Sequence, residues 1–164
     1  MKRLWKNRLF AVLMKSTSVA ALGAVVSAVS ISAQAAPMTE ALVQDYAAAM
    51  KASANGQSIN QVSRLVSDDA LISLSRRGKS TSLDKAAYLN LLKNSWDDTS
   101  NYSYDIKVDN VVITGEQAKA NFTTNESWVK DGREVSFVTR SRVTLGLSTG
   151  DAVLLRAVSQ VTIN

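Results

Sequence analysis

The sequence contains neither cysteine nor histidine. The lack of cysteine excludes disulfide bonds, a thiol nucleophile and a lipid-modified N-terminal cysteine. The lack of histidine removes the usual base of serine and cysteine triads, and zinc or copper sites lose both imidazole and thiolate ligands. No Gly-rich phosphate loop or dinucleotide fingerprint occurs either. We therefore expect no cofactor, and the commonest catalytic centres are excluded.

The segment DDTSN, Asp97 to Asn101, is the strongest candidate for a metal site built from oxygen ligands. Its spacing lacks the alternating acids and the central glycine of a calcium-binding loop. A loop between a helix and a strand explains the same residues. We favour the loop and expect no metal site.

The first 35 residues have the pattern of a secretory signal peptide. A basic, acid-free stretch at residues 1–15 precedes a charge-free, apolar stretch from Ser16 to Ala36. Small residues at Ala33 and Ala35 then mark a cleavage site after Ala35. About 20 apolar residues could instead form an uncleaved anchor, but the Ala- and Ser-rich composition and the cleavage site favour removal. We predict a periplasmic or secreted protein without a stable membrane anchor.

The intact mass of the exported chain tests this prediction. The mass of the full-length, uncleaved chain would instead support a membrane anchor.

Removal of this segment changes the charge of the protein. The whole chain has a net charge of +5, with 19 basic and 14 acidic residues. All of the acids, but only 14 of the basic residues, lie after residue 36, so the mature chain from Ala36 to Asn164 is formally neutral. A neutral domain has no bulk electrostatic attraction for nucleic acid or anionic membranes. We therefore expect no nucleic-acid partner.

Hydrophobic periodicity predicts one α+β domain over residues 36–164. Helices are indicated at 39–56, from Ser58 onward, and at 81–96, with capping residues at Thr39, Ser58 and Thr81. A short strand at 70–75 lies between the second and third helices. From residue 102 the period changes to two, and four long strands follow, joined by turns at Gly115, at Asp131-Gly132 and at 148–150. The alternation of apolar and polar residues shifts by one position at Asn110, which indicates a β-bulge.

Tight turns require antiparallel pairing, and strands this long require a strongly curled sheet. One face of each strand is apolar, so the three helices must cover that face and form a cone with a hollow side. The element order, the segment DDALISLSRRGKSTSLDKAAYLNLLKNSW and the closing meander resemble NTF2-like proteins of the SnoaL-like kind. The resemblance implies a cone with three N-terminal helices on a strongly curved antiparallel sheet, an apolar pocket and, in many members, a dimer. It does not imply one function, because the family includes isomerases, cyclases, dehydratases, ligand carriers and interaction modules.

The segment NFTTNESW, residues 121–128, contains the strongest candidate for chemistry. Its two sugar-acceptor triplets have no role in a bacterial periplasm, which leaves Glu126. The alternation of side chains along the strand from Phe122 places Glu126 on the apolar face, which the helices should cover. However, Glu126 is close to the Asp131-Gly132 turn and could reach solvent at the rim of the sheet. A shift of one residue in the strand register would also turn it outward. The rim is the favoured interpretation. The candidate catalytic residues are Glu126 and Tyr104, and the candidate ligand-binding residues are Tyr88, Trp96, Tyr104, Phe122, Glu126, Trp128 and Ser141.

The opposite, convex face combines arginines with aliphatic residues. The candidate interface consists of Val138, Arg140, Arg142, Leu154, Arg156 and Val158. This composition is typical of an interface, and a homodimer across the face is one prediction. A solvated sheet face on which arginine stems cover three aliphatic residues explains the same pattern.

Two functions from different classes follow. The leading one is an exported, non-catalytic domain that binds a small apolar or amphipathic ligand, or a protein partner. The alternative is a cofactor-free isomerase or hydrolyase in which Glu126 is the base and Tyr104 or Tyr88 assists.

Overall fold

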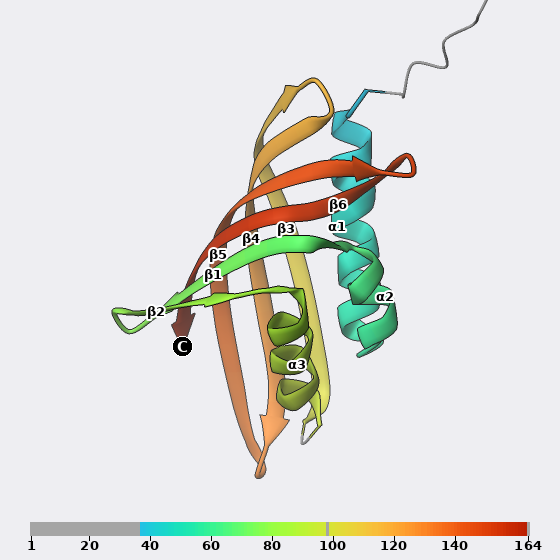
Figure 1. Cartoon of the computed structure of the whole chain (residues 1–164). Coiled ribbons are helices and arrows are strands. Elements are labelled where there is room, and N and C mark those ends of the chain that lie inside the picture. The colour runs from blue at the N-terminus through green and yellow to red at the C-terminus, as the bar shows by residue number, and fades with distance from the viewer. Residues whose placement is uncertain (1–36, 98, 164) are drawn as a thin grey trace, which may run out of the picture. The chain divides into compact units, whose positions relative to one another are not determined.

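The computed structural model describes residues 37–97 and 99–163, so the predicted signal peptide, residues 1–35, lies outside the described residues. In these described residues, three helices and six strands follow one another (Figure 1). They are α1 (Glu40–Asn55), α2 (Ile59–Arg64), β1 (Val66–Arg76), β2 (Lys79–Leu83), α3 (Lys85–Trp96), β3 (Ser100–Thr114), β4 (Gln117–Lys130), β5 (Arg133–Ser148) and β6 (Asp151–Ile163). No helix in this part of the chain has the length and hydrophobicity needed to cross a membrane.

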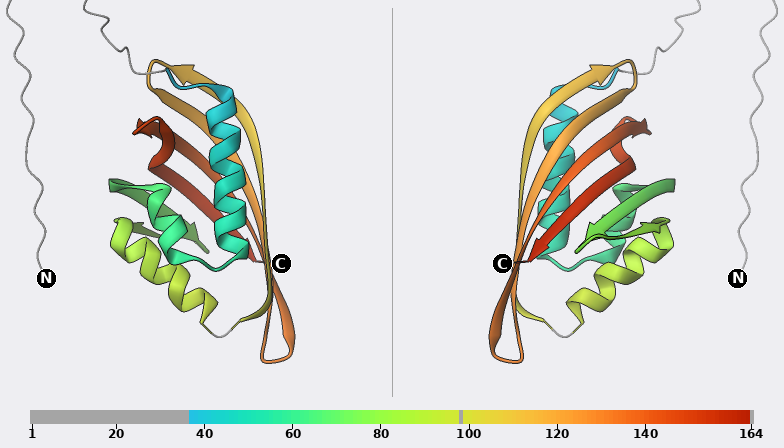
Figure 2. Two further views of the ribbon diagram at one scale, coloured as in Figure 1. Left: turned by 90° about the vertical axis from the view of Figure 1, so that its right-hand side faces the viewer. Right: turned by 90° about the vertical axis from the view of Figure 1, so that its left-hand side faces the viewer.

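All six strands form one strongly curved sheet in the order β2-β1-β6-β5-β4-β3. The helices cover its concave face, and no helix of the described residues covers its convex face (Figure 2). The core between these layers includes Val43, Tyr46 and Met50 from α1, and Ile72 and Leu145 from the sheet. The predicted α+β cone, with three N-terminal helices packed on a curved sheet, is confirmed.

Two details of the sheet differ from the expectation. The strand β2, which the sequence did not indicate, pairs with β1 and extends the sheet where the third helix was expected to begin. Thr81 therefore pairs with Leu74 in the sheet, and Asp84 caps α3 by accepting a 2.8 Å hydrogen bond from the Ala87 N–H. In addition, β1 pairs with β6 in parallel. Tight turns set the direction of consecutive strands only, and these two strands are distant in the sequence.

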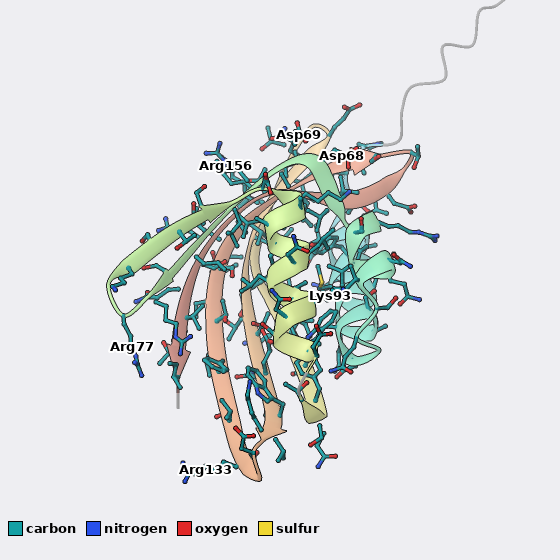
Figure 3. All side chains as sticks on the ribbon, turned by 60° about the horizontal axis from the view of Figure 1, so that its bottom comes forward. Asp68, Asp69, Arg77, Lys93, Arg133 and Arg156 are labelled. Atoms are coloured by element: carbon teal, nitrogen blue, oxygen red, sulfur yellow. The ribbon has the colours of Figure 1, made fainter. Side chains whose placement is uncertain are left out.

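Three hairpins turn through two consecutive residues with positive φ. The pairs are Arg77-Gly78 (50° and 76°), Asp131-Gly132 (51° and 71°) and Thr149-Gly150 (52° and 93°). Positive φ at both central residues is the type I′ geometry, whose twist matches that of paired strands. Figure 3 shows Arg77 and Arg133 at the tips of two of these hairpins. The turn predicted at Asp131-Gly132 is thus confirmed.

The pairing register of the sheet shifts at several positions, and two of these bulges affect the faces on which side chains lie. In β3 the pairing shifts between Asp109 and Val112, and Asn110 has a φ of 54°, as its phase slip predicted. In β6 the pairing shifts at Leu155, which has no partner on β5. The side chain of Leu155 lies over Gly146, where a Cβ atom would come within 2.7 Å of Leu155 Cδ1. This second bulge was not predicted, and it reverses the faces of the preceding β6 residues.

A side chain of α1 binds the free edge of β3. Asn55 Nδ2 donates to the Tyr104 carbonyl at 2.8 Å, and the Tyr104 N–H donates to Asn55 Oδ1 at 2.8 Å. The amide thus satisfies the backbone of an edge strand as another strand would. The exposed Lys51–Asp105 ion pair, 2.6 Å long, lies beside it. Together these contacts hold Tyr104 at a defined position on the concave face.

Candidate functional site

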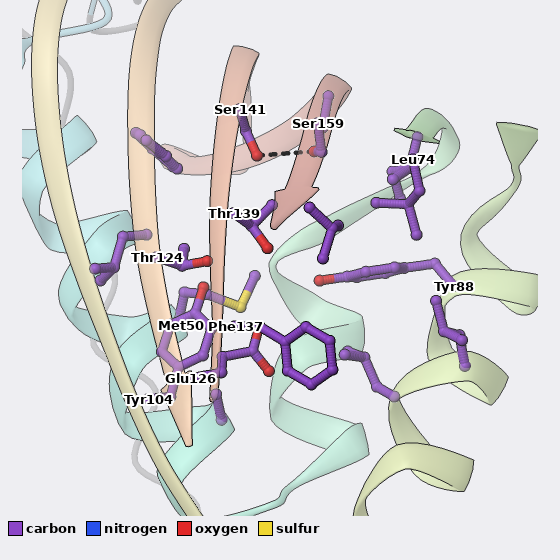
Figure 4. A pocket seen from close by; sticks show the side chains of 18 of the residues that line it. Met50, Leu74, Tyr88, Tyr104, Thr124, Glu126, Phe137, Thr139, Ser141 and Ser159 are labelled. Atoms are coloured by element: carbon purple, nitrogen blue, oxygen red, sulfur yellow. Dashed lines mark hydrogen bonds between the residues drawn. The ribbon is translucent and has the colours of Figure 1, made fainter. Parts of the chain in front are cut away.

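A cavity of about 340 Å³ lies between the helices and the concave face of the sheet. Figure 4 shows part of its lining, with hydroxyl, carboxyl and aromatic groups directed inward. All seven predicted ligand-binding residues line it, namely Tyr88, Trp96, Tyr104, Phe122, Glu126, Trp128 and Ser141. Residues distant in the sequence are brought together here because α1, α3 and the curved sheet enclose one space.

Glu126 faces this cavity and does not lie at a solvated rim, so the favoured interpretation of its position was wrong. It pairs with Tyr104 on β3 and with Phe137 on β5, well within the sheet. The strands β4 and β5 continue beyond it to the turn at Asp131-Gly132, and aromatic residues line the cavity around it. The side chain is therefore half-buried.

The direct partner of Glu126 is Tyr102, which the sequence-based choice of Tyr104 or Tyr88 missed. The Tyr102 hydroxyl donates to Glu126 Oε2 at 2.9 Å. Tyr104 is the residue directly opposite Glu126, whereas Tyr102 lies two residues further along the same face. Long side chains on antiparallel strands reach such diagonal neighbours. The shared face was visible in the alternation of Tyr102, Tyr104 and Ile106, but the diagonal contact was not.

The electrostatics of the cavity favour the neutral form of Glu126. Burial raises the pKa of Glu126 above its ordinary value, and the hydrogen bond from Tyr102 offsets part of this effect. No ion pair of Glu126 exists among the described residues. Burial, and secondly the charge of Glu126, raise the pKa of both Tyr88 and Tyr102. The tyrosines therefore remain hydrogen-bond donors, and the raised pKa makes the Glu126 carboxylate a stronger base than a carboxylate in water.

One wall of the cavity is a continuous series of aromatic rings. Trp96 meets Tyr102 edge-on at 5.9 Å, Tyr102 stacks with Trp128 at 6.2 Å, and Trp128 stacks with Phe137 at 4.9 Å. The Arg76 guanidinium lies 5.3 Å from the centre of the Phe137 ring and lines the same cavity. A wall of aromatic rings favours the binding of flat, apolar ligands. The exposed Arg76 adds a positive charge beside this wall, and the sequence analysis did not identify it.

The floor of the cavity carries hydroxyl groups in the middle of the sheet. Thr124, Thr139, Ser141 and Ser159 line it, and the hydroxyls of Ser141 and Ser159 share a 2.8 Å hydrogen bond (Figure 4). Thr124 and Ser159 are buried, yet each retains hydrogen-bonding capacity toward the cavity. These groups can bind oxygen atoms of a ligand without adding charge.

The convex face differs from its expected composition at one residue. Leu154, predicted to belong to the interface, is 5% exposed and lines the cavity on the other side of the sheet. The bulge at Leu155 is the reason, because it reverses the direction of the residues before it. Val158 is 50% exposed and Val138 half-buried, while Arg140, Arg142 and Arg156 are exposed. The apolar part of the predicted interface is thus smaller than expected, and the homodimer stays a prediction.

The comparisons with known proteins rest on structure. No protein-family model and no curated protein sequence matches the chain significantly. A conserved protein from Planctomyces limnophilus superposes with a TM-score of 0.67 at 14% identity, covering 76% of this chain and 97% of the other. An NTF-2 like protein of unknown function from Silicibacter pomeroyi superposes with a TM-score of 0.53 at 12% identity, and the match covers 76% of this chain and 94% of the other. The fold is NTF2-like.

A third similar structure is that of a candidate scytalone dehydratase from Novosphingobium aromaticivorans. It superposes on the NTF2-like domain with a TM-score of 0.59 at 12% identity, covering 76% of this chain and 80% of the other. Identities this low establish the shared fold of these proteins and not a shared activity. The resemblance inferred from the sequence is therefore confirmed for the fold, while function depends on the residues of the cavity.

Proposed function

We propose that the NTF2-like domain binds a small, largely apolar molecule with a polar group inside the concave cavity. The observation that supports this is the cavity of about 340 Å³ walled by Trp96, Tyr102, Trp128 and Phe137. Its volume lies within the range of small-ligand pockets, about 300–1,000 Å³. As part of the same proposal, residues 1–35 direct export, and the mature domain binds its ligand in the periplasm or outside the cell.

The polar groups of the cavity indicate which ligands fit. An aromatic or alicyclic body can pack against the aromatic wall, while a hydroxyl or amine donates to Glu126. The hydroxyls of Thr139, Ser141 and Ser159 can bind a second oxygen at the floor. An anionic group beside Glu126 would be repelled once that carboxyl ionises. The proposed ligand is therefore a neutral or cationic amphipathic molecule.

The second candidate function is proton transfer by a cofactor-free isomerase or hydrolyase, and the half-buried Glu126 in the cavity is the observation that favours it. A carboxylate with a raised pKa and no cationic partner is suited to remove a proton from a carbon beside a carbonyl group. The Tyr88 hydroxyl, which points into the cavity in Figure 4, could then donate to the developing oxyanion. The structural similarity to a candidate scytalone dehydratase agrees with this chemistry at the level of fold alone.

Ligand binding can be tested with 2-naphthol as the probe. Trp96 and Trp128 line the cavity, so saturable binding should change their fluorescence. Replacing Ala157, which lines the cavity, by leucine should fill part of it and weaken binding by about tenfold or more. The matched control is Val158→Leu, because the next residue along β6 faces the convex side and should leave binding unchanged. Equal affinities of the two variants, with unchanged circular dichroism, would refute the cavity as the binding site.

A further inference from the structure

The convex face contains a second hollow, of about 360 Å³, on the side of the sheet away from the helices. Three cationic residues line it, namely Lys119 on β4, Arg142 on β5 and Arg156 on β6. The side-chain amides of Asn110 and Asn121 contribute further hydrogen-bonding groups. Its lining contains no acidic residue.

The pairing register explains why the three cations converge. Lys119 pairs with Thr144, which pairs with Arg156 on the next strand. Since neighbouring strands lie about 4.8 Å apart, the backbones of Lys119 and Arg156 are separated by about 10 Å. Arg142 lies on the middle strand, two residues along from Thr144, and its side chain points to the same face. The three cationic side chains therefore extend from neighbouring positions on the convex face and line one hollow.

The bulges at Asn110 and Leu155 border this hollow. The β3 bulge places Asn110 beside the segment from Lys119 to Asn121. The β6 bulge at Leu155 directs Leu154 to the concave side and places the Leu155 side chain over Gly146. Neither leucine lines the hollow, whose exposed aliphatic residue is Val158.

The charges in the hollow are not neutralised within the described part of the chain. Lys119, Arg142 and Arg156 form no ion pair there. The nearest acid by register is Asp109, which pairs with Asn121 in the sheet and binds Lys107 at 3.3 Å. Because acidic and basic residues after residue 36 are equal in number, this cluster reflects local segregation of charge and not an overall excess. Such a concentration of positive charge attracts anions.

We infer that this hollow binds the phosphate group of a small phosphorylated molecule. A carboxylate is satisfied by one arginine, whereas a phosphate has enough acceptor oxygens and charge for two arginines, a lysine and neighbouring amides at once. A second copy of this chain is a poorer occupant, because a two-fold contact centred here would bring Arg142 and Arg156 against like charges. The small volume also fits a compact ligand better than an extended polymer.

The test is calorimetric titration of the purified protein with inorganic phosphate and with glycerol 3-phosphate. Arg142→Gln and Arg156→Gln each remove one charge-assisted hydrogen bond to phosphate. Each substitution should therefore weaken phosphate binding by about tenfold. The matched control is Arg140→Gln, which removes the same charge from the same face of β5 but does not line the hollow. Its affinity should change by less than about twofold. All three arginines are exposed, and thermal unfolding should show that the variants remain folded.

The possible results separate this site from its alternatives. Saturable millimolar or tighter binding that the two hollow variants lose and Arg140→Gln retains supports the inference. Equal losses in all three variants would show diffuse electrostatic attraction and overturn it. Binding to phosphatidylglycerol vesicles but to neither soluble phosphate would indicate a membrane surface instead, and also overturn it. The inference would also be overturned if the wild-type protein bound no phosphate and sedimented as a dimer that the Val158→Asp substitution dissociates.

Discussion

Replacing Phe122 by alanine should lower the free energy of unfolding by about 3–5 kcal/mol. Phe122 is 5% exposed in the middle of β4, and its ring lies 5.9 Å from that of Tyr46 on α1. The substitution removes one of the contacts that join α1 to the sheet and leaves a void beside the cavity. Chemical denaturation measures the loss directly.

The control for this prediction is Val112→Ala on β3. Val112 is 59% exposed, so truncating it should change stability by no more than about 0.5 kcal/mol. A loss below about 1 kcal/mol for Phe122→Ala would mean that the helix and sheet are less tightly packed than the structure shows. Because Phe122 lines the cavity, the variant should also accept bulkier ligands than the wild type.

Replacing Glu126 by glutamine should separate the two candidate functions. If Glu126 is the base of an isomerase or hydrolyase, the turnover rate should fall by about 100-fold or more, because glutamine cannot take up the proton. If the domain binds a ligand without catalysis, affinity should change modestly, since glutamine still accepts a hydrogen bond from Tyr102. Turnover that survives this substitution would eliminate the catalytic role of Glu126.

The same substitution should change how stability depends on pH. The pKa of Glu126 is raised in the folded state because the side chain is buried. The folded protein therefore has its full stability below the unfolded pKa, about 4.3 for glutamate, and loses part of it as pH rises through the folded pKa. The variant should be more stable than the wild type at neutral pH, and this gain should disappear under acidic conditions. Denaturant unfolding across this pH range measures the difference, with the exposed Glu116→Gln as the control.

Local signals in the sequence determined most of the elements and several of their boundaries. Thr39 and Ser58 cap α1 and α2 by accepting hydrogen bonds from the N–H groups of Leu42 and Gln61, three residues onward. The turn at Asp131-Gly132 and the bulge at Asn110 occur where the residue types and the phase placed them. These features depend on neighbours within a few residues, so the linear sequence contains the information needed to predict them.

The existence of the cavity and many of its lining residues could also be predicted from the sequence. Alternation along β4 placed Phe122, Glu126 and Trp128 on one face, and the need to cover that face with helices implied a hollow. All seven candidate ligand-binding residues line that hollow, and their role in binding stays a prediction. The alternation left the direction of Glu126 open, because a strand pattern does not show how far neighbouring strands extend beyond a residue.

Contacts between distant segments decided the rest. The polar strand β2 exists because β1 offers it an edge, and β6 lies parallel to β1 because the curved sheet brings the last strand beside the first. Tyr102 became the partner of Glu126 through a diagonal contact between strands. One unpaired residue, Leu155, moved Leu154 from the convex face to the cavity. The periodicity of a strand sets which residues share a face, but register, bulges and strand order depend on free energies of pairing that no single segment contains.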